Sequence, residues 1–244
     1  MSGPLAVAGA TATLARQRQH HLEKGPQMRF SAALFDLDGT LLNTLEDIAD
    51  SANAALERAG FATHPTPAYR TFVGEGVRLL AERALPEGSR DDATVESIMD
   101  AIREEYGHRW ADKTRPYDGI AAMLAQLGEL RVRMAILSNK PDDSTKMCAA
   151  RLLPEGAFEI VLGARDGVPR KPDPTAAVEI ASRMGFAPGE FLYLGDTRTD
   201  MQTAIGAGMF PVGALWGFRD EMELREAGAR ELVRSPAEVV ALVR

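Results

Sequence analysis

Two aspartates, Asp36 and Asp38, follow a short apolar run in the stretch FSAALFDLD. The run is typical of a buried strand, and side chains two residues apart in a strand point to the same face. Two carboxylates held together in this way repel each other, and removing each from water costs free energy. We therefore expect a positive charge to lie beside them.

Further polar side chains follow two other apolar runs that we expect to be strands. The run VRMAILSN ends in Ser138 and Asn139, and FLYLGDTRTD leads from a strand into Asp196 and, one helical turn later, Asp200. In doubly wound sheets, ligands bind beyond the carboxyl ends of the strands. If these strands are neighbours, four carboxylates meet at one place, and such a cluster favours a hard divalent cation, above all Mg²⁺.

The remaining polar residues suit a phosphate group. Thr40 and Ser138 carry hydroxyl donors, and backbone N–H groups around Gly39 can donate as well. Lys171, in the stretch RKPDP before a predicted helix, supplies a cation beside Asp36 and an incoming phosphoryl group. Since bound Mg²⁺ usually keeps coordination positions for phosphate oxygens, the pattern predicts phosphate chemistry at the strand ends.

The order of the predicted elements indicates how these residues are positioned. After Pro116, helices alternate with strands, which indicates βαβ units and a parallel sheet with helices on both faces. We predict an α/β fold with a Rossmann-like parallel sheet core, formed by residues 28–43 and 115–244. Residues 44–114 are predicted to be a small helical cap domain inserted after the first strand, and residues 1–27 an N-terminal extension.

The cap is expected to close over the strand ends, because it leaves the sheet directly after the acidic loop. Thr44 and Asp47 resemble a capping box at the start of its first helix. In the stretch FVGEGVR, Gly74 and Gly76 precede a predicted helix, where free backbone N–H groups favour an anion, and Arg78 lies one turn inside. We expect the two glycines and Arg78 to contribute to substrate specificity.

The composition of the 244-residue chain narrows the class of protein. A net charge of −7 and a pI of about 5.2 argue against nucleic acid or an anionic membrane as the main partner. The longest apolar runs are shorter than the roughly 20 residues that span a bilayer. The single cysteine, Cys148, excludes an internal disulfide and fits a reducing compartment. We expect a cytoplasmic monomer or homodimer with a small-molecule partner.

Four motifs resemble, in this order, those of the haloacid dehalogenase superfamily: DLDGT, a strand-end SN, a lysine in KPDP, and GDTRTD. The stretches TFVGEGVRLLAERAL, RPYDGI and WGFR are similar to the phosphoglycolate phosphatase-like branch. The resemblance implies a Mg²⁺-dependent phosphomonoester hydrolase that acts on a small phosphorylated metabolite, above all 2-phosphoglycolate. It also implies an aspartyl-phosphate intermediate.

The resemblance implies a role for each motif residue. Asp36 would be the nucleophile, and Asp38 the general acid and base. The Asp36 carboxylate, the Asp38 backbone carbonyl and Asp196 would hold Mg²⁺, with Asp200 close behind. The residues that would hold the transferring phosphoryl group are Thr40, Ser138, Asn139 and Lys171.

Other functions stay open at this point. Dehalogenation needs neither Mg²⁺ nor a leaving-group acid, so Asp38 argues against it. A β-phosphoglucomutase-like phosphotransferase would keep every core motif and differ mainly in the cap, as would a pyrophosphatase, a nucleotide phosphatase or a sugar phosphatase. A non-catalytic phosphate-binding protein is disfavoured by the complete motif set. The chain departs from the superfamily at Asn43, where aspartate is usual, and there we expect altered cap closure or no effect.

Overall fold

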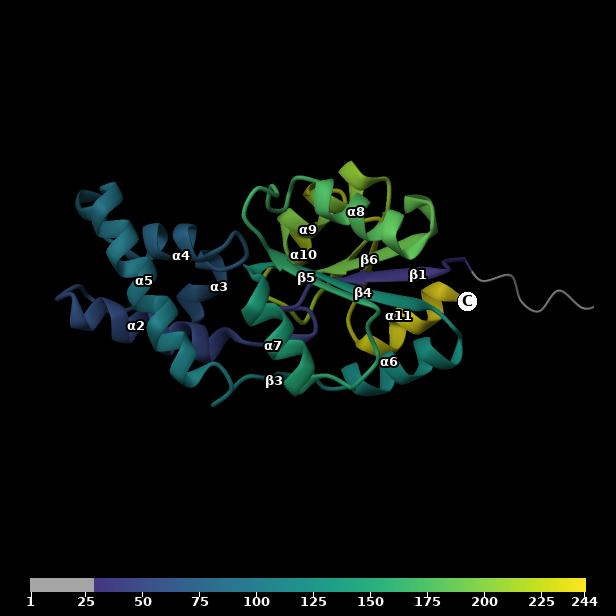
Figure 1. Cartoon of the computed structure of the whole chain (residues 1–244), viewed down its shortest axis with the longest axis horizontal. Coiled ribbons are helices and arrows are strands. Elements are labelled where there is room, and N and C mark those ends of the chain that lie inside the picture. The colour runs from purple at the N-terminus through teal and green to yellow at the C-terminus, as the bar shows by residue number, and fades with distance from the viewer. Residues whose placement is uncertain (1–28) are drawn as a thin grey trace, which may run out of the picture.

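The structure, a computed structural model, describes residues 29–244. These residues form a parallel sheet of six strands in the order β5-β4-β1-β6-β7-β8 (Figure 1). The predicted α/β fold is thereby confirmed, whereas the predicted extension over residues 1–27 lies outside the described residues. The strands are β1 Ala32–Phe35, β4 Arg133–Pro141, β5 Ile160–Ala164, β6 Phe191–Gly195, β7 Phe210–Ala214 and β8 Glu231–Val233.

Side chains from alternate positions of β1 enter two apolar cores, one on each face of the sheet. Ala33 and Phe35 pack into one core, and Ala32 and Leu34 pack into the other. Because both faces are covered, β1 is apolar at every position instead of alternating with polar residues. Cys148 is fully buried in the core that contains Phe35.

Helices cover both faces of the sheet (Figure 1). The helices that contribute to the Phe35 core are α6 Ile120–Glu129, α7 Asp142–Leu152 and α11 Pro236–Val243. The helices on the opposite face are α8 Thr175–Met184 and α9 Arg198–Ala207, with α10 Glu221–Glu226 beside α9. Within residues 29–244, no helix combines the length and the apolarity needed to cross a membrane.

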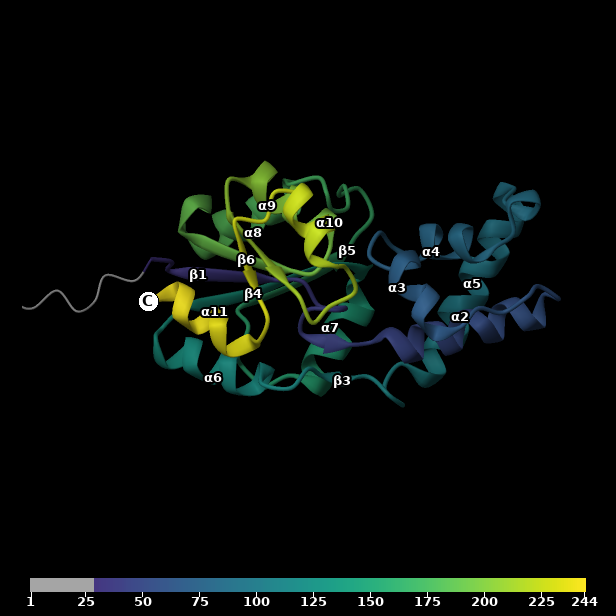
Figure 2. The ribbon, with the colours of Figure 1, turned by 180° about the vertical axis from the view of Figure 1, so that it is seen from behind.

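The cap helices pack around a separate apolar core, to which the sheet domain contributes Phe218. Its fully buried members include Ala52, Leu56, Tyr69 and Ala81. Figures 1 and 2 show these helices gathered beyond the end of the sheet where β1 leads into the acidic loop. They are α2 Leu45–Arg58, α3 Tyr69–Phe72, α4 Val77–Ala84 and α5 Asp92–Arg109.

Two linkers join the cap to the sheet, and they pair with each other. β2 Leu42–Asn43 and β3 Arg115–Pro116 form a two-stranded antiparallel ribbon in which Asn43 lies opposite Arg115. The sequence does not predict this ribbon, because two residues in each strand are too few to show a periodic pattern. Asn43 thus lies in the junction between cap and core.

The predicted capping box at the start of α2 is wrong. The Thr44 side chain makes no hydrogen bond to the helix, and Asp47 is buried against the opposite linker. The Oδ2 atom of Asp47 accepts hydrogen bonds from the Thr114 N–H and hydroxyl, both at 2.7 Å, and from the Lys113 N–H at 3.0 Å. A buried carboxylate with three donors therefore ties the first cap helix to the returning chain.

Asp47→Ala is expected to lower the free energy of unfolding by about 3 kcal/mol, because it leaves the two buried donors of Thr114 and the partly buried N–H of Lys113 without an acceptor. Urea unfolding measures the loss. Asp50→Ala is the matched control: Asp50 lies on the same helix and pairs with the Lys113 ammonium at 2.7 Å, but this ion pair is exposed to water. Equal losses in the two variants would contradict a special role for Asp47.

Candidate active site

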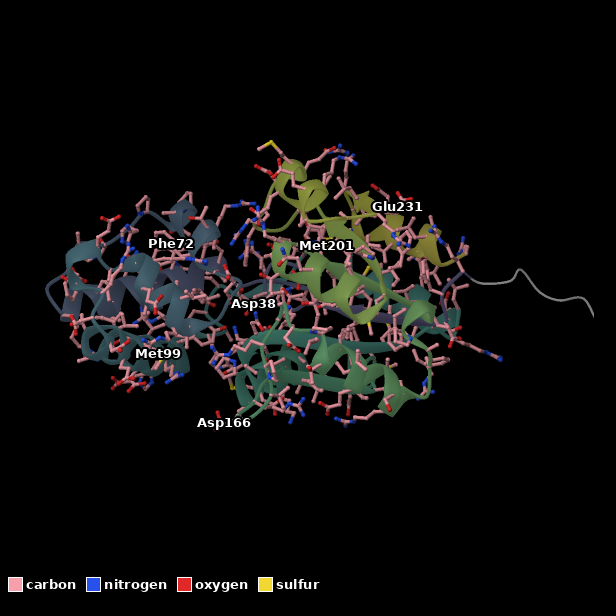
Figure 3. The ribbon with its side chains drawn as sticks, turned by 90° about the horizontal axis from the view of Figure 1, so that it is seen from above. Asp38, Phe72, Met99, Asp166, Met201 and Glu231 are labelled. Carbon is pink, nitrogen blue, oxygen red and sulfur yellow. The ribbon has the colours of Figure 1, made fainter. Side chains whose placement is uncertain are left out.

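The predicted site residues meet at one edge of the sheet because their strands are neighbours. β1 lies between β4 and β6, so the Asp36–Asp38 loop is flanked by Ser138 of β4 and by Asp196, which follows β6. Figure 3 shows Asp38 where the cap meets the sheet domain. The cap thus adjoins the edge at which the polar residues converge.

Three buried carboxylates form a cluster suited to a cation. Asp36, Asp196 and Asp200 each offer an oxygen, and these oxygens lie within 4.8 Å of one another. Burial, reinforced by the charge of Asp200, raises the pKa of Asp196 to about 7 and that of Asp36 well above its ordinary value. Without a cation, the cluster resists full ionisation. A hard divalent ion would remove this penalty, so these oxygen donors fit Mg²⁺.

Lys171 lies between two of these carboxylates. Its ammonium is 2.7 Å from Asp200 Oδ1 and 2.8 Å from Asp36 Oδ1, although the second contact lacks regular hydrogen-bond geometry. Burial alone would lower the pKa of Lys171, but the charges of Asp200 and Asp36 raise it well above its ordinary value. The ammonium therefore keeps its charge, and it is the positive group expected beside Asp36.

A second buried lysine, Lys140, pairs with Asp38. Its Nζ atom lies 3.0 Å from Asp38 Oδ1 and 3.2 Å from Oδ2, and 4.4 Å from the ring centre of Tyr106 in α5. Lys140 is not among the residues that the sequence motifs single out. The available signal was its position in the stretch LSNKP, directly after Ser138 and Asn139 at the strand end.

Two of the predicted phosphate ligands make hydrogen bonds within the protein. The Thr40 hydroxyl donates to Asp196 Oδ1 at 3.0 Å. Asn139 accepts from the Lys171 N–H at 2.9 Å and donates to the carbonyl groups of Lys171 and Gly74, at 3.0 and 3.1 Å. Asn139 therefore positions the Lys171 main chain and connects it to the cap.

A cavity of about 150 Å³ lies between the cap and the sheet edge. Asp36, Asp38, Ser138 and Lys140 form part of its core side. The cap side is mostly apolar, and its apolar lining residues are Ile48, Val73, Val77, Leu80 and Ile102. The candidate nucleophile thus shares a small, mostly apolar cavity with the cap.

Of the three predicted specificity residues, two line the cavity and one does not. Gly74 and Gly76 line the cavity, with φ angles of +120° and +95° that L side chains rarely adopt. Arg78 does not line it: its guanidinium pairs with Glu82 at 3.1 Å and with Asp92. These acidic partners on the cap helices hold the Arg78 side chain, so we leave it out of the proposed site.

A parallel sheet with carboxylates at its carboxyl edge, a buried lysine beside them and a helical cap define an α/β protein with a capped acidic site. The chain belongs to the haloacid dehalogenase-like hydrolase family, whose model matches residues 33–214. This confirms the membership that the four motifs predicted.

Relatives with the name phosphoglycolate phosphatase match most of the chain. One from Thiobacillus denitrificans is 29% identical over 87% of this chain and 95% of its own length. One from Xylella fastidiosa is 31% identical over 76% of this chain and 80% of its own length. A crystal structure from Lactobacillus delbrueckii, named provisionally as a phosphoglycolate phosphatase, is 28% identical with a TM-score of 0.83, over 88% of this chain and 99% of that one. The prediction that the chain is a phosphatase is confirmed.

Proposed function

We propose that the protein is a Mg²⁺-dependent phosphomonoester hydrolase that acts on a small phosphorylated acid, with 2-phosphoglycolate as the leading substrate. The observation that carries the proposal is that Asp36 and Asp38 share one cavity under the cap. The cavity of about 150 Å³ is smaller than the ~300–1,000 Å³ of typical ligand pockets, which favours a small metabolite over a nucleotide. The names of the relatives support phosphoglycolate.

In the proposed reaction, a carboxylate oxygen of Asp36 attacks phosphorus and displaces the alkoxide of the ester, which leaves an aspartyl-phosphate. Asp38 donates a proton to the departing oxygen. It then takes a proton from a water molecule that attacks the phosphorus, which releases inorganic phosphate and restores the Asp36 carboxylate. Ser138 and Lys171 would hold the phosphoryl oxygens. The Ser138 side chain lines the cavity, and the Lys171 ammonium lies 2.8 Å from Asp36 Oδ1.

The metal would be held by the Asp36 carboxylate, the Asp38 backbone carbonyl and Asp196, with Asp200 close behind. When bound, Mg²⁺ supplies positive charge that offsets these carboxylates and the phosphoryl oxygens. The hydrogen bonds that Asp196 accepts from the Thr40 hydroxyl and from the Phe218 N–H, at 3.0 and 2.8 Å, fix this carboxylate in place.

Mg²⁺ is expected to be required for turnover, and Ca²⁺ is expected to inhibit. Ca²⁺ is larger and takes more ligands, so it would misplace Asp36 relative to phosphorus. Phosphate release is measured after exhaustive chelation, after Mg²⁺ is restored, and with Ca²⁺ added at fixed Mg²⁺. Full activity in excess chelator would reject the metal site built on Asp36 and Asp196.

A hydrolysis screen tests the proposed function. The purified full chain is assayed with Mg²⁺ against 2-phosphoglycolate, sugar phosphates, nucleotides and pyrophosphate, with Asp36→Asn as the blank. The highest kcat/KM is expected for 2-phosphoglycolate. If the protein releases phosphate from none of these compounds, the proposal is overturned. Isomerisation of β-glucose 1-phosphate without phosphate release would favour the phosphotransferase alternative.

A further inference from the structure

Lys140 is a buried cation for which the proposed chemistry has no use. Its side chain is only 6% exposed, yet it lines the cavity. An ammonium has three N–H donors, and within residues 29–244 its hydrogen bonds of regular geometry go to the two oxygens of one carboxylate, Asp38, while the Tyr106 hydroxyl also lies close to it. Lys140 can therefore donate to a second anion that enters the cavity.

The hydroxyl of Tyr106 is a second unused donor at the same place. It is shielded from water and makes no hydrogen bond of regular geometry within the described part of the chain, although the Lys140 ammonium and the Cys148 thiol lie close to it. Burial raises the pKa of this phenol against the opposing charge of Lys140, so the hydroxyl keeps its proton. Tyr106 comes from cap helix α5 and Lys140 from core strand β4, and the Lys140 ammonium lies over the Tyr106 ring.

Among the described residues that line the cavity, Lys140 is the buried cation. Among the described residues that line it, the cations are Lys140 and Arg103. Arg103 is exposed and pairs with Asp100 of its own helix at 2.9 Å. Most of the remaining cap side chains in the lining are apolar and cannot donate a hydrogen bond.

We propose that Lys140 and the Tyr106 hydroxyl form a subsite for a carboxylate on the substrate, next to Asp38. This inference rests on the proposed function, in which the phosphoryl group binds at Asp36. In this subsite, Lys140, at the boundary between core and cap, would recognise the carboxylate of a phosphorylated acid. A carboxylate there would receive charge-assisted hydrogen bonds from a largely buried ammonium, where such bonds are strong.

Two esters that differ only at the proposed contact provide the test. 2-Phosphoglycolate carries a carboxylate, and 2-hydroxyethyl phosphate carries an alcohol in its place. Wild-type protein is expected to prefer the acid by at least about tenfold in kcat/KM. Lys140→Gln keeps a donor for Asp38 but removes the charge. The ratio of kcat/KM for the acid to kcat/KM for the alcohol should therefore fall by about 10–100-fold, mainly because KM for the acid rises.

Three further variants separate recognition from a general disturbance of the site. Lys140→Arg restores the charge and should recover part of the preference. Tyr106→Phe removes only the hydroxyl and should lower the preference by a smaller factor. Arg103→Gln is the matched control, because it removes the other cation of the lining, and it should leave the ratio unchanged.

The outcomes distinguish the subsite from the function on which it rests. If Lys140→Gln slows both esters equally, Lys140 only positions Asp38 and the subsite is overturned. If Arg103→Gln abolishes the preference instead, the carboxylate binds elsewhere. If the wild type hydrolyses both esters equally well, the subsite fails while the phosphatase proposal stands. If it hydrolyses neither these esters nor any other in the screen, the proposed function fails first.

Discussion

Asp36→Asn is expected to reduce kcat by on the order of 10⁴-fold or more, because an amide oxygen cannot replace the carboxylate as nucleophile. The substitution keeps the shape of the side chain, and Lys171 retains its 2.7 Å contact with Asp200 Oδ1. The variant should therefore fold, and its circular dichroism spectrum and melting temperature should resemble those of the wild type. Kinetics with 2-phosphoglycolate at saturating Mg²⁺ measure the effect.

A covalent readout makes this prediction more specific. Acid quenching during turnover of a ³²P-labelled ester should trap radioactivity on wild-type protein and none on Asp36→Asn. Asp50→Asn is the matched control, since Asp50 is a half-exposed aspartate on cap helix α2, away from the cavity. Retention of most of the wild-type rate in Asp36→Asn would remove this residue from the nucleophile role.

Asp38→Asn is expected to cost about 10²–10⁴-fold in kcat, the usual contribution of general acid–base catalysis. The size of the loss should depend on the ester. An aryl phosphate with an acidic phenol needs little help from a proton donor, so it should lose less than an alkyl phosphate. Rates across esters of graded leaving-group pKa measure this dependence.

Equal losses across that series would indicate that Asp38 acts structurally, most directly by holding the Lys140 ammonium at 3.0 Å. The variant leaves Lys140 beside a neutral amide, so thermal melts must accompany the kinetics. A large drop in melting temperature together with equal losses would assign Asp38 to stability and leave the proton donor to another group.

The longer helices and strands were predictable, because apolar runs separated by turn residues mark them in the sequence. The elements missed are the shortest ones. β8 spans only Glu231–Val233, and β2 and β3 have two residues each, too few for a period of two to stand out. These strands exist because tertiary neighbours supply their pairing, which local sequence does not encode.

The site was predictable where residue type and strand end coincide, as for Asp36, Asp38 and Asp196. It was not predictable where a partner comes from a distant segment. Lys140 resembles a solvated lysine in sequence, and only the fold brings it to Asp38, 102 residues away. Asp47 fits a local capping pattern, but the buried donors of Thr114 outcompete that local bond.

The ribbon of β2 and β3 also brings the two ends of the cap insertion side by side. The chain leaves the core and returns to it at paired neighbours, Asn43 and Arg115, so a short turn there would close the core without the insertion. The central strand β1 pairs only with β4 and β6 within the described residues, and the buried members of the cap's apolar cluster come from the cap apart from Phe218. Exchange of one cap for another at this junction would therefore change which molecules reach Asp36 without altering the strand register that carries it.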